Sequence, residues 1–198
     1  MDEKFLLIVK NALQVYTKFG IKSVSMDDLC REIGISKATL YKYVTNKEEL
    51  LERIFVDYLA MEFAAWAQGY GLAEKKNAID YFFSIIEYLQ THTVVNPLML
   101  NDLQLHYPSV FEKIYEKERQ QKYTILEKNL QQGQAENLYR SDINAPLVLF
   151  IFANTVIKDF QGISSFEGKD VFNEILRIYM CAIATPQGLE YYTQKMAQ

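Results

Sequence analysis

The sequence is poor in the residues that break regular structure, with four prolines and eight glycines in 198 residues. An all-β fold needs many tight turns, and such turns require more glycine and proline than this. Cysteine is scarcer still, because Cys30 and Cys181 are the only two and no CxxC pair occurs. Two separate cysteines cannot form a metal site alone. Each lies in an apolar helical pattern, where free cysteine behaves as a small hydrophobic residue, and a redox-sensing role is the alternative.

Long hydrophobic runs are also absent, and this excludes a membrane-spanning helix. The longest apolar stretch, Leu147–Ala153, is far shorter than the roughly 20 residues that cross a bilayer. The N-terminal MDEKFLLIVK has early acidic residues and too short an apolar run for a signal peptide. We therefore expect a cytoplasmic protein with reduced thiols.

Catalytic motifs are missing as well. The sequence contains no Gly-rich phosphate loop, nucleophile elbow or HExxH pattern. Histidine occurs only at His92 and His106; Asp102 and His106 have the i,i+4 spacing of a shared metal site, but no third ligand follows from the spacing. We therefore expect neither an enzyme nor a bound metal or cofactor.

The net charge of −4 is unevenly distributed along the chain. Residues 1–53 contain nine Lys and Arg against eight Asp and Glu, whereas residues 54–198 contain twelve against seventeen. A DNA-binding domain needs its cations only on one face, so the overall charge does not exclude a nucleic-acid partner.

Apolar residues recur every three to four positions in almost every segment, and no alternating strand pattern is present. The sequence therefore predicts an all-α fold. Short segments with cap residues lie between Gly20 and Asn46, whereas later segments such as Asn77–His92 are apolar nearly all round. We expect a three-helix helix-turn-helix domain over residues 1–46 and a larger domain of about nine helices over residues 47–198.

The helix limits near the N-terminus are marked by cap residues. Gly20 predicts the end of the first helix, and Ser25 with Asp28 forms a capping-box pattern for a helix over Met26–Ile33. Gly34 predicts a turn, after which Ser36 caps a very short helix that runs to about Tyr43. Asn46, with Glu49 three residues later, starts a long helix that we expect to run to about Gln68 and to be broken by Gly69 and Gly71.

Residues Ser25–Lys47 thus have the pattern of a helix, a short glycine-containing turn and a short helix. This arrangement can present its second helix to the major groove of DNA. Apolar residues fill the angle between the two helices, and the outward residues offer cations, a hydroxyl, a methyl group and two phenols for phosphates and base edges. The alternative is an amphipathic surface turn that never contacts DNA. The outward residues are Lys37, Ala38, Thr39, Tyr41, Lys42 and Tyr43.

The run from Phe5 to Phe55 resembles the N-terminal domain of TetR-family regulators over its whole length. The first-helix pattern LLIVKNALQVYTKFG is followed by SVSMDDLCREIGISKATLYKYVTNKEELL, in which SK-x-TLY-x-Y and NKEELL are the most specific parts. The resemblance implies that Lys37, Ala38, Thr39 and Lys42 face base edges and that Tyr41 and Tyr43 lie near the DNA backbone. It also implies phosphate contacts at Ser25 and Lys47, and Ser36 offers a further helix N-terminus for a phosphate. Ala38 replaces a common glycine and Lys42 a common histidine or aromatic residue, so the operator sequence cannot be transferred from relatives.

Two C-terminal helices have more apolar surface than one subunit needs, which indicates a four-helix bundle between two subunits. The resemblance implies the same, because relatives dimerise through their last two long helices. The alternative is that these helices close the core of a single chain. The expected interface residues are Leu147, Phe150, Ile151, Ile157, Phe172, Ile175, Tyr179 and Ile183.

The resemblance further implies a cavity for a small lipophilic effector among the helices around Asn77–His92. Effector binding would favour a state with wrongly spaced recognition helices, reached through the fourth helix and the segment Pro97–Tyr107. Control by a protein partner is the alternative. The candidate lining residues, each of which could instead be plain core, are Phe63, Trp66, Phe82, Tyr88, Met99, Leu103 and Tyr123.

Overall fold

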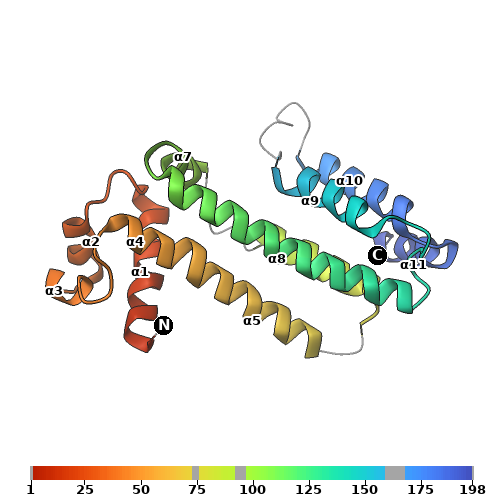
Figure 1. Cartoon of the computed structure of the whole chain (residues 1–198), viewed down its shortest axis with the longest axis horizontal. Coiled ribbons are helices and arrows are strands. Elements are labelled where there is room, and N and C mark those ends of the chain that lie inside the picture. Colours follow the sequence, from red (N-terminus) through yellow and green to blue (C-terminus); the bar gives the residue numbers. More distant parts are fainter. Residues whose placement is uncertain (1, 73–75, 92–96, 159–167, 198) are drawn as a thin grey trace. The chain divides into compact units, whose positions relative to one another are not determined.

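The computed structural model describes residues 2–72, 76–91, 97–158 and 168–197, and helices account for most of them (Figure 1). In this part of the chain no strand forms, and one isolated bridge pairs Tyr139 with Ala184. The predicted all-α fold is confirmed. From Lys47 onward nine helical elements follow in the described ranges, and the first three of these are continuous. Among the described residues no helix is long and apolar enough to cross a membrane.

The elements follow the predicted order. They are α1 (Glu3–Phe19), α2 (Met26–Ile33), α3 (Lys37–Leu40), α4 (Lys47–Glu52), the π-helical segment η1 (Arg53–Tyr58), α5 (Leu59–Leu72), α6 (Ala78–Thr91), α7 (Pro97–His106), α8 (Pro108–Ala135), α9 (Ala145–Lys158), α10 (Gly168–Ile183) and α11 (Pro186–Met196).

Two of the predicted limits were wrong. The long helix formed by α4, η1 and α5 does not break at Gly69 and Gly71 but continues to Leu72. Glycine in a helix interior costs only about 1 kcal/mol relative to alanine, which a long helix can absorb. The α3 helix ends at Leu40, and the residues up to Tyr43 form a turn instead of a further helical turn.

The chain divides into two compact units. Unit 1 comprises residues 1–67 and 91–118, and unit 2 comprises residues 68–90 and 119–198. The core of unit 1 joins α1–α4 and η1 to Met99 and Leu103 of α7 and to Val110 and Ile114 of α8. Residues on both sides of position 46 thus share one core, and a domain boundary at that position stays a prediction.

The core of unit 2 contains a cluster of aromatic rings. Phe82 of α6 lies 5.8 Å from Phe152 of α9 and 5.4 Å from Tyr179 of α10, measured between ring centroids. The buried Asn129 of α8 donates to the carbonyl oxygen of Ala78 at 2.6 Å and accepts from the Tyr139 hydroxyl at 3.3 Å. Helices α6, α8, α9 and α10 are therefore joined by apolar packing with a satisfied polar group among them.

The two cysteines have different surroundings. Cys30 is buried in the core of unit 1, as expected of a small hydrophobic residue, whereas Cys181 on α10 is exposed. The apolar periodicity of α10 is carried by its neighbours Met180 and Ile183, which are both fully buried. Cys181 is not on that buried face. The expectation that it behaves as a small hydrophobic residue, which rested on the apolar pattern of the segment, therefore does not hold for Cys181.

Candidate nucleic-acid interface

The start of α2 is held by the capping box that the sequence predicts. The backbone N–H of Asp28 donates to Ser25 Oγ at 3.1 Å, and the backbone N–H of Ser25 donates to Asp28 Oδ2 at 3.2 Å. The Ser25 hydroxyl donates to the same carboxylate, and these hydrogen bonds hold the pKa of Asp28 below its usual range. Ser25 is exposed, but its backbone N–H and hydroxyl both donate to Asp28, and the expected phosphate contact stays a prediction.

The turn between α2 and α3 depends on Gly34. Its φ of 71° and ψ of 34° lie in the left-handed region, which glycine adopts without the cost of a Cβ atom. Cys30 and Leu40 are buried on either side of the turn, and Ile33 and Ile35 are half-buried against the same core. The turn therefore joins two helices that share one core, which is the order of elements in a helix-turn-helix.

The short α3 helix presents most of its surface to solvent. Its N-cap Ser36 accepts from the backbone N–H of Thr39 at 3.1 Å, while buried Leu40 anchors the other end. Lys37, Ala38, Tyr41 and Lys42 are exposed in α3 and the following turn, and Thr39 is half-buried.

Tyr43 differs from the other outward residues because α1 holds its ring. The ring stacks on Phe5 with centroids 4.7 Å apart and an interplanar angle of 6°. Such a contact contributes beyond simple burial and fixes the turn after α3 against α1. The expected position of Tyr43 near DNA backbone stays a prediction, since the structure shows a packing role in addition.

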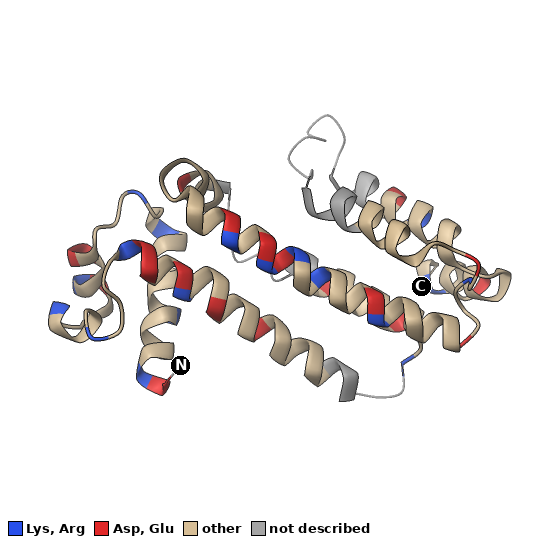
Figure 2. Cartoon of the chain, in the orientation of Figure 1, with Lys and Arg blue, Asp and Glu red and all other residues tan. Residues whose placement is uncertain are grey.

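Charge around α3 is positive. Between Ile33 and Lys47 the sequence has three lysines and no acidic residue, and Figure 2 shows only basic colouring on α3 and the turn after it. Lys37 forms an exposed ion pair with Asp27 of α2 at 2.5 Å, and this hydrogen bond raises the pKa of Lys37. Exposed pairs contribute little stability, so DNA could draw Lys37 away from its partner.

Lys47, at the start of α4, has surroundings that its place in the sequence did not reveal. Its Nζ donates to the backbone oxygens of Ile21 at 2.5 Å and of Val24 at 2.6 Å. The same ammonium lies 5.7 Å from the ring centroid of Tyr16 and 5.8 Å from that of Tyr107. An ammonium has three N–H donors, so after these two hydrogen bonds one remains for a phosphate.

Residues 20–25 connect α1 to α2, and Lys47 binds two backbone oxygens of this connection. Asp102 of α7 binds the same connection. The side chain is 6% exposed, and its Oδ2 accepts from the backbone N–H of Lys22 at 2.8 Å. Burial lowers the pKa of Lys47, and the nearby Asp102 carboxylate acts in the opposite direction. Gly20 begins this connection with a φ of 81°, and a Cβ there would lie 3.3 Å from the Asp102 carboxylate.

Among the described residues no group of three His, Cys, Asp or Glu could hold a metal.

The N-terminal part of α8 is attached to α4 by polar contacts. The Ser109 hydroxyl donates to Glu48 at 2.6 Å, and Lys113 forms an ion pair with Glu52. All four residues belong to unit 1. Helices α4, α7 and the start of α8 thus pack in the same core as the helix-turn-helix.

The predicted effector-lining residues divide between the two units. Phe63 and Trp66 of α5 are half-buried, and their ring centroids are 5.7 Å apart. Met99 and Leu103 are fully buried in the core of unit 1. In unit 2, Phe82 is fully buried in the aromatic cluster, and Tyr88 and Tyr123 are half-buried. Which of the seven contact an effector stays a prediction.

The predicted dimer residues fall into distinct groups. Leu147, Phe150 and Ile151 on α9 are each more than half exposed, and Ile175 on α10 is half-buried. Tyr179 and Ile183 are buried within unit 2 itself, so the chain already covers them. The side chains of Ile157 and Phe172 lie outside the described residues. Ile178, which the sequence analysis did not select, is 58% exposed on α10.

The contacts of Lys47 predict a loss of stability on its replacement. Lys47→Met keeps an unbranched side chain but leaves two carbonyl oxygens without their donor, so we expect unfolding to require about 1–3 kcal/mol less free energy. Lys42→Met is the matched control, since the exposed Lys42 has no such contact to lose and its replacement should change stability by less than about 0.5 kcal/mol. Urea unfolding followed by circular dichroism measures both. Equal stability of the two variants would contradict the structural role of Lys47.

Comparisons with known proteins find relatives of the helix-turn-helix region. Residues 8–54 match the family model described as bacterial regulatory proteins, tetR family. The HTH-type transcriptional regulator YhgD of Bacillus subtilis is 30% identical over 115 residues, which are 57% of this chain and 60% of the relative. The biofilm operon HTH-type negative transcriptional regulator IcaR of Staphylococcus epidermidis is 30% identical over 59 residues, which are 26% of this chain and 32% of IcaR. The alignments thus span less than two thirds of either relative.

The fold is shared with solved structures at low sequence identity. A transcriptional regulator from Cytophaga hutchinsonii superposes with a TM-score of 0.71 and 19% identity, covering 93% of this chain and 100% of that one. Both curated relatives are named as transcriptional regulators, and neither is named as an enzyme. The matched residues include the whole of α2, the turn at Gly34 and α3. Over residues 8–54 the chain is therefore similar to the tetR family of bacterial regulatory proteins, and it shares its fold with a solved transcriptional regulator.

Proposed function

We propose that this protein is a dimeric repressor that binds a palindromic DNA operator and leaves it when a small lipophilic effector binds. The observation that carries this proposal is the exposed surface of α3 and the turn after it, where Lys37 and Ala38 of the helix and Lys42 of the turn are open to solvent. The similarity to IcaR, which is named as a negative regulator, favours repression over activation. Because the proposed partner is bacterial DNA, we also propose a cytoplasmic location.

Base recognition follows from the chemistry of this face. Lys37 and Lys42 can donate to the O6 and N7 acceptors of guanine, and the Ala38 methyl group can contact the methyl group of thymine. Contacts to phosphate fix orientation without reading sequence, and the helix N-termini at Ser25 and Ser36 together with Lys47 suit that role.

Dimerisation is supported by the apolar side chains that unit 2 exposes. Leu147 on α9 is 53% exposed and Ile178 on α10 is 58% exposed, and these helices contact each other within the unit. Two such helix pairs can form a four-helix bundle around a two-fold axis. A dimer of this kind would set the two α3 helices roughly 34–36 Å apart, which matches successive major grooves on one face of DNA.

Coupling between effector and DNA is supported by the contacts of α7. Asp102 binds the backbone N–H of Lys22 in the connection that leads to α2, so a displacement of α7 would be transmitted to the helix-turn-helix. We infer that the effector acts as a population shift, because it binds more tightly to a state in which α7 and the helix-turn-helix have moved. Within unit 2, the candidates Phe82, Tyr88 and Tyr123 are the place to look for its cavity.

The DNA-binding proposal predicts different effects for two lysines. With an operator selected from random duplexes, Lys42→Ala should lower affinity and relax the preference at one base pair in each half-site, at a cost of about 1–3 kcal/mol. Lys47→Ala should instead weaken binding to all sequences alike and reduce the slope of log affinity against log salt by about 1. Fluorescence anisotropy over a salt series measures both, with folded protein quantified by circular dichroism. An unchanged salt slope for Lys47→Ala would exclude its phosphate contact.

The dimer proposal is tested at the two exposed residues. The double variant Leu147→Glu with Ile178→Glu places like charges in the proposed bundle, so we expect monomers in sedimentation velocity and at least a tenfold loss of operator affinity, about 1.4 kcal/mol. Leu105→Glu is the matched control because Leu105 is 64% exposed on α7, a helix of unit 1 that contributes no residue to the proposed bundle. A double variant that still sediments as a dimer would refute this interface.

The effector proposal is tested by thermal shift. A drug-like lipophilic compound that binds the folded protein should raise its Tm by mass action, and the same compound should release the operator in anisotropy measurements. Stabilisation by operator DNA alone, with no response to any lipophile in the screen, would instead support control by a protein partner.

A further inference from the structure

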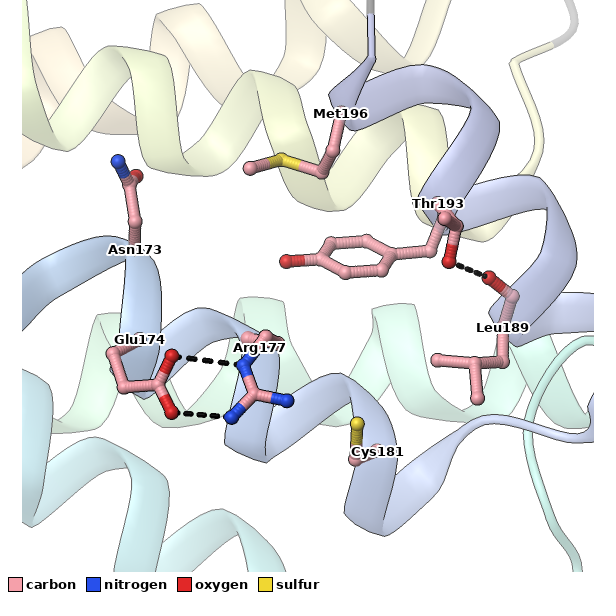
Figure 3. Close-up of a pocket in the computed structure, with 8 residues that line it drawn as sticks. Asn173, Glu174, Arg177, Cys181, Leu189, Thr193 and Met196 are labelled. Carbon is pink, nitrogen blue, oxygen red and sulfur yellow. Dashed lines mark hydrogen bonds and ion pairs between the residues drawn. The ribbon is translucent and has the colours of Figure 1, made fainter. Parts of the chain in front are cut away.

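A pocket of about 470 Å³ lies within unit 2 between α10 and α11 (Figure 3). None of its lining residues belongs to the seven candidates for the effector cavity or to the expected dimer residues. The pocket is lined by Asn173, Glu174, Arg177 and Cys181 of α10 and by Leu189, Tyr192, Thr193 and Met196 of α11.

Tyr192 contributes a buried hydroxyl that has no hydrogen-bond partner. The residue is 4% exposed, and its ring stacks on Phe83 of α6 with centroids 5.7 Å apart. Tyr192 is itself one of the residues that line the pocket, and burial raises the pKa of its phenol. Buried donors are almost always paired, so an unpaired phenol at a pocket indicates a missing acceptor.

The two charged groups of the pocket wall pair with each other, and the exposed Asn173 contributes an uncharged amide. Arg177 Nε donates to Glu174 Oε2 at 2.8 Å, and a second N–H of the guanidinium donates to the other carboxylate oxygen (Figure 3). This bidentate pair cancels the two formal charges in the wall. The Thr193 hydroxyl donates to the carbonyl oxygen of Leu189 at 2.8 Å. An uncharged ligand therefore fits the pocket better than an ion does.

The remaining surface of the pocket is apolar and adaptable. Leu189 and Met196 contribute aliphatic side chains from α11, and Met196 follows Tyr192 by one helical turn. Met196 is 44% exposed, and its unbranched thioether can change conformation at little cost to admit a ligand above the phenol.

We propose that this pocket binds a small uncharged lipophile with a carbonyl oxygen, which accepts a hydrogen bond from the Tyr192 hydroxyl. The apolar part of the ligand packs on Leu189 and Met196. This is a second ligand site, separate from the effector cavity proposed above, and it depends on neither DNA nor that cavity.

The test compares benzophenone, a lipophilic ketone, with diphenylmethane, which has the same two rings but no acceptor. Both are titrated into the intact chain without DNA, using isothermal titration calorimetry. We expect Tyr192→Phe to weaken benzophenone by about threefold to tenfold, the contribution of one hydrogen bond, and to leave diphenylmethane unchanged. Tyr191→Phe is the matched control, because the Tyr191 hydroxyl is paired with Asp80 at 2.9 Å and does not line the pocket.

The location is checked in two further ways. Irradiated benzophenone should label the tryptic peptides Ile178–Lys195 or Met196–Gln198, which contain the α11 side of the pocket. Leu189→Trp, which fills the pocket, should abolish binding of both compounds with an unchanged far-UV circular dichroism spectrum. Equal affinity of benzophenone for wild type and Tyr192→Phe, labelling elsewhere in the chain, or full binding by Leu189→Trp would each overturn the proposal.

Discussion

The helix-turn-helix depends on the ammonium group of Lys47, which binds two carbonyl oxygens of the connection between α1 and α2. A connection without regular structure has backbone acceptors that no helix satisfies, and burying them unpaired is costly. One lysine at the first position of α4 satisfies the oxygens of Ile21 and Val24 together. The rings of Tyr16 and Tyr107 lie close to the same charge and favour it electrostatically. Within the apolar core that α1, α2 and α4 share, this ammonium therefore fixes the connection that leads into α2.

Asp102 makes this arrangement sensitive to α7. A buried carboxylate is retained only where it is paired, and this one binds the Lys22 backbone N–H at 2.8 Å close to the Lys47 ammonium. The connection before α2 is thus held by a cation from α4 and by an anion from α7. We propose that a movement of either helix would shift α3 without any change inside the helix-turn-helix. In the function proposed here, this is the physical route from effector to DNA.

Local features were predictable from sequence, and contacts between distant segments were not. The caps at Ser25 and Asn46 and the turn at Gly34 depend on residues within a few positions, so their patterns identified the helix limits. The partners of Lys47 lie 23 and 26 residues away, and no periodicity indicates such contacts. Family resemblance selected Lys47 as a phosphate ligand, whereas its packing role required coordinates. Tyr192 is similar, since an aromatic residue in a short amphipathic helix gives no sign of an unpaired hydroxyl.

The α10 helix shows why its apolar residues could not all be assigned to one role from sequence. Tyr179 and Ile183 face the core of unit 2, whereas Ile178 is one residue before Tyr179 and points about 100° away, toward solvent. Arg177 and Cys181, one turn apart, form a third face that lines the pocket beside α11. A ligand in that pocket would therefore contact the same rigid helix that exposes Ile178 to a second subunit. If both proposals hold, a change in α10 at the pocket would alter the surface available for dimerisation.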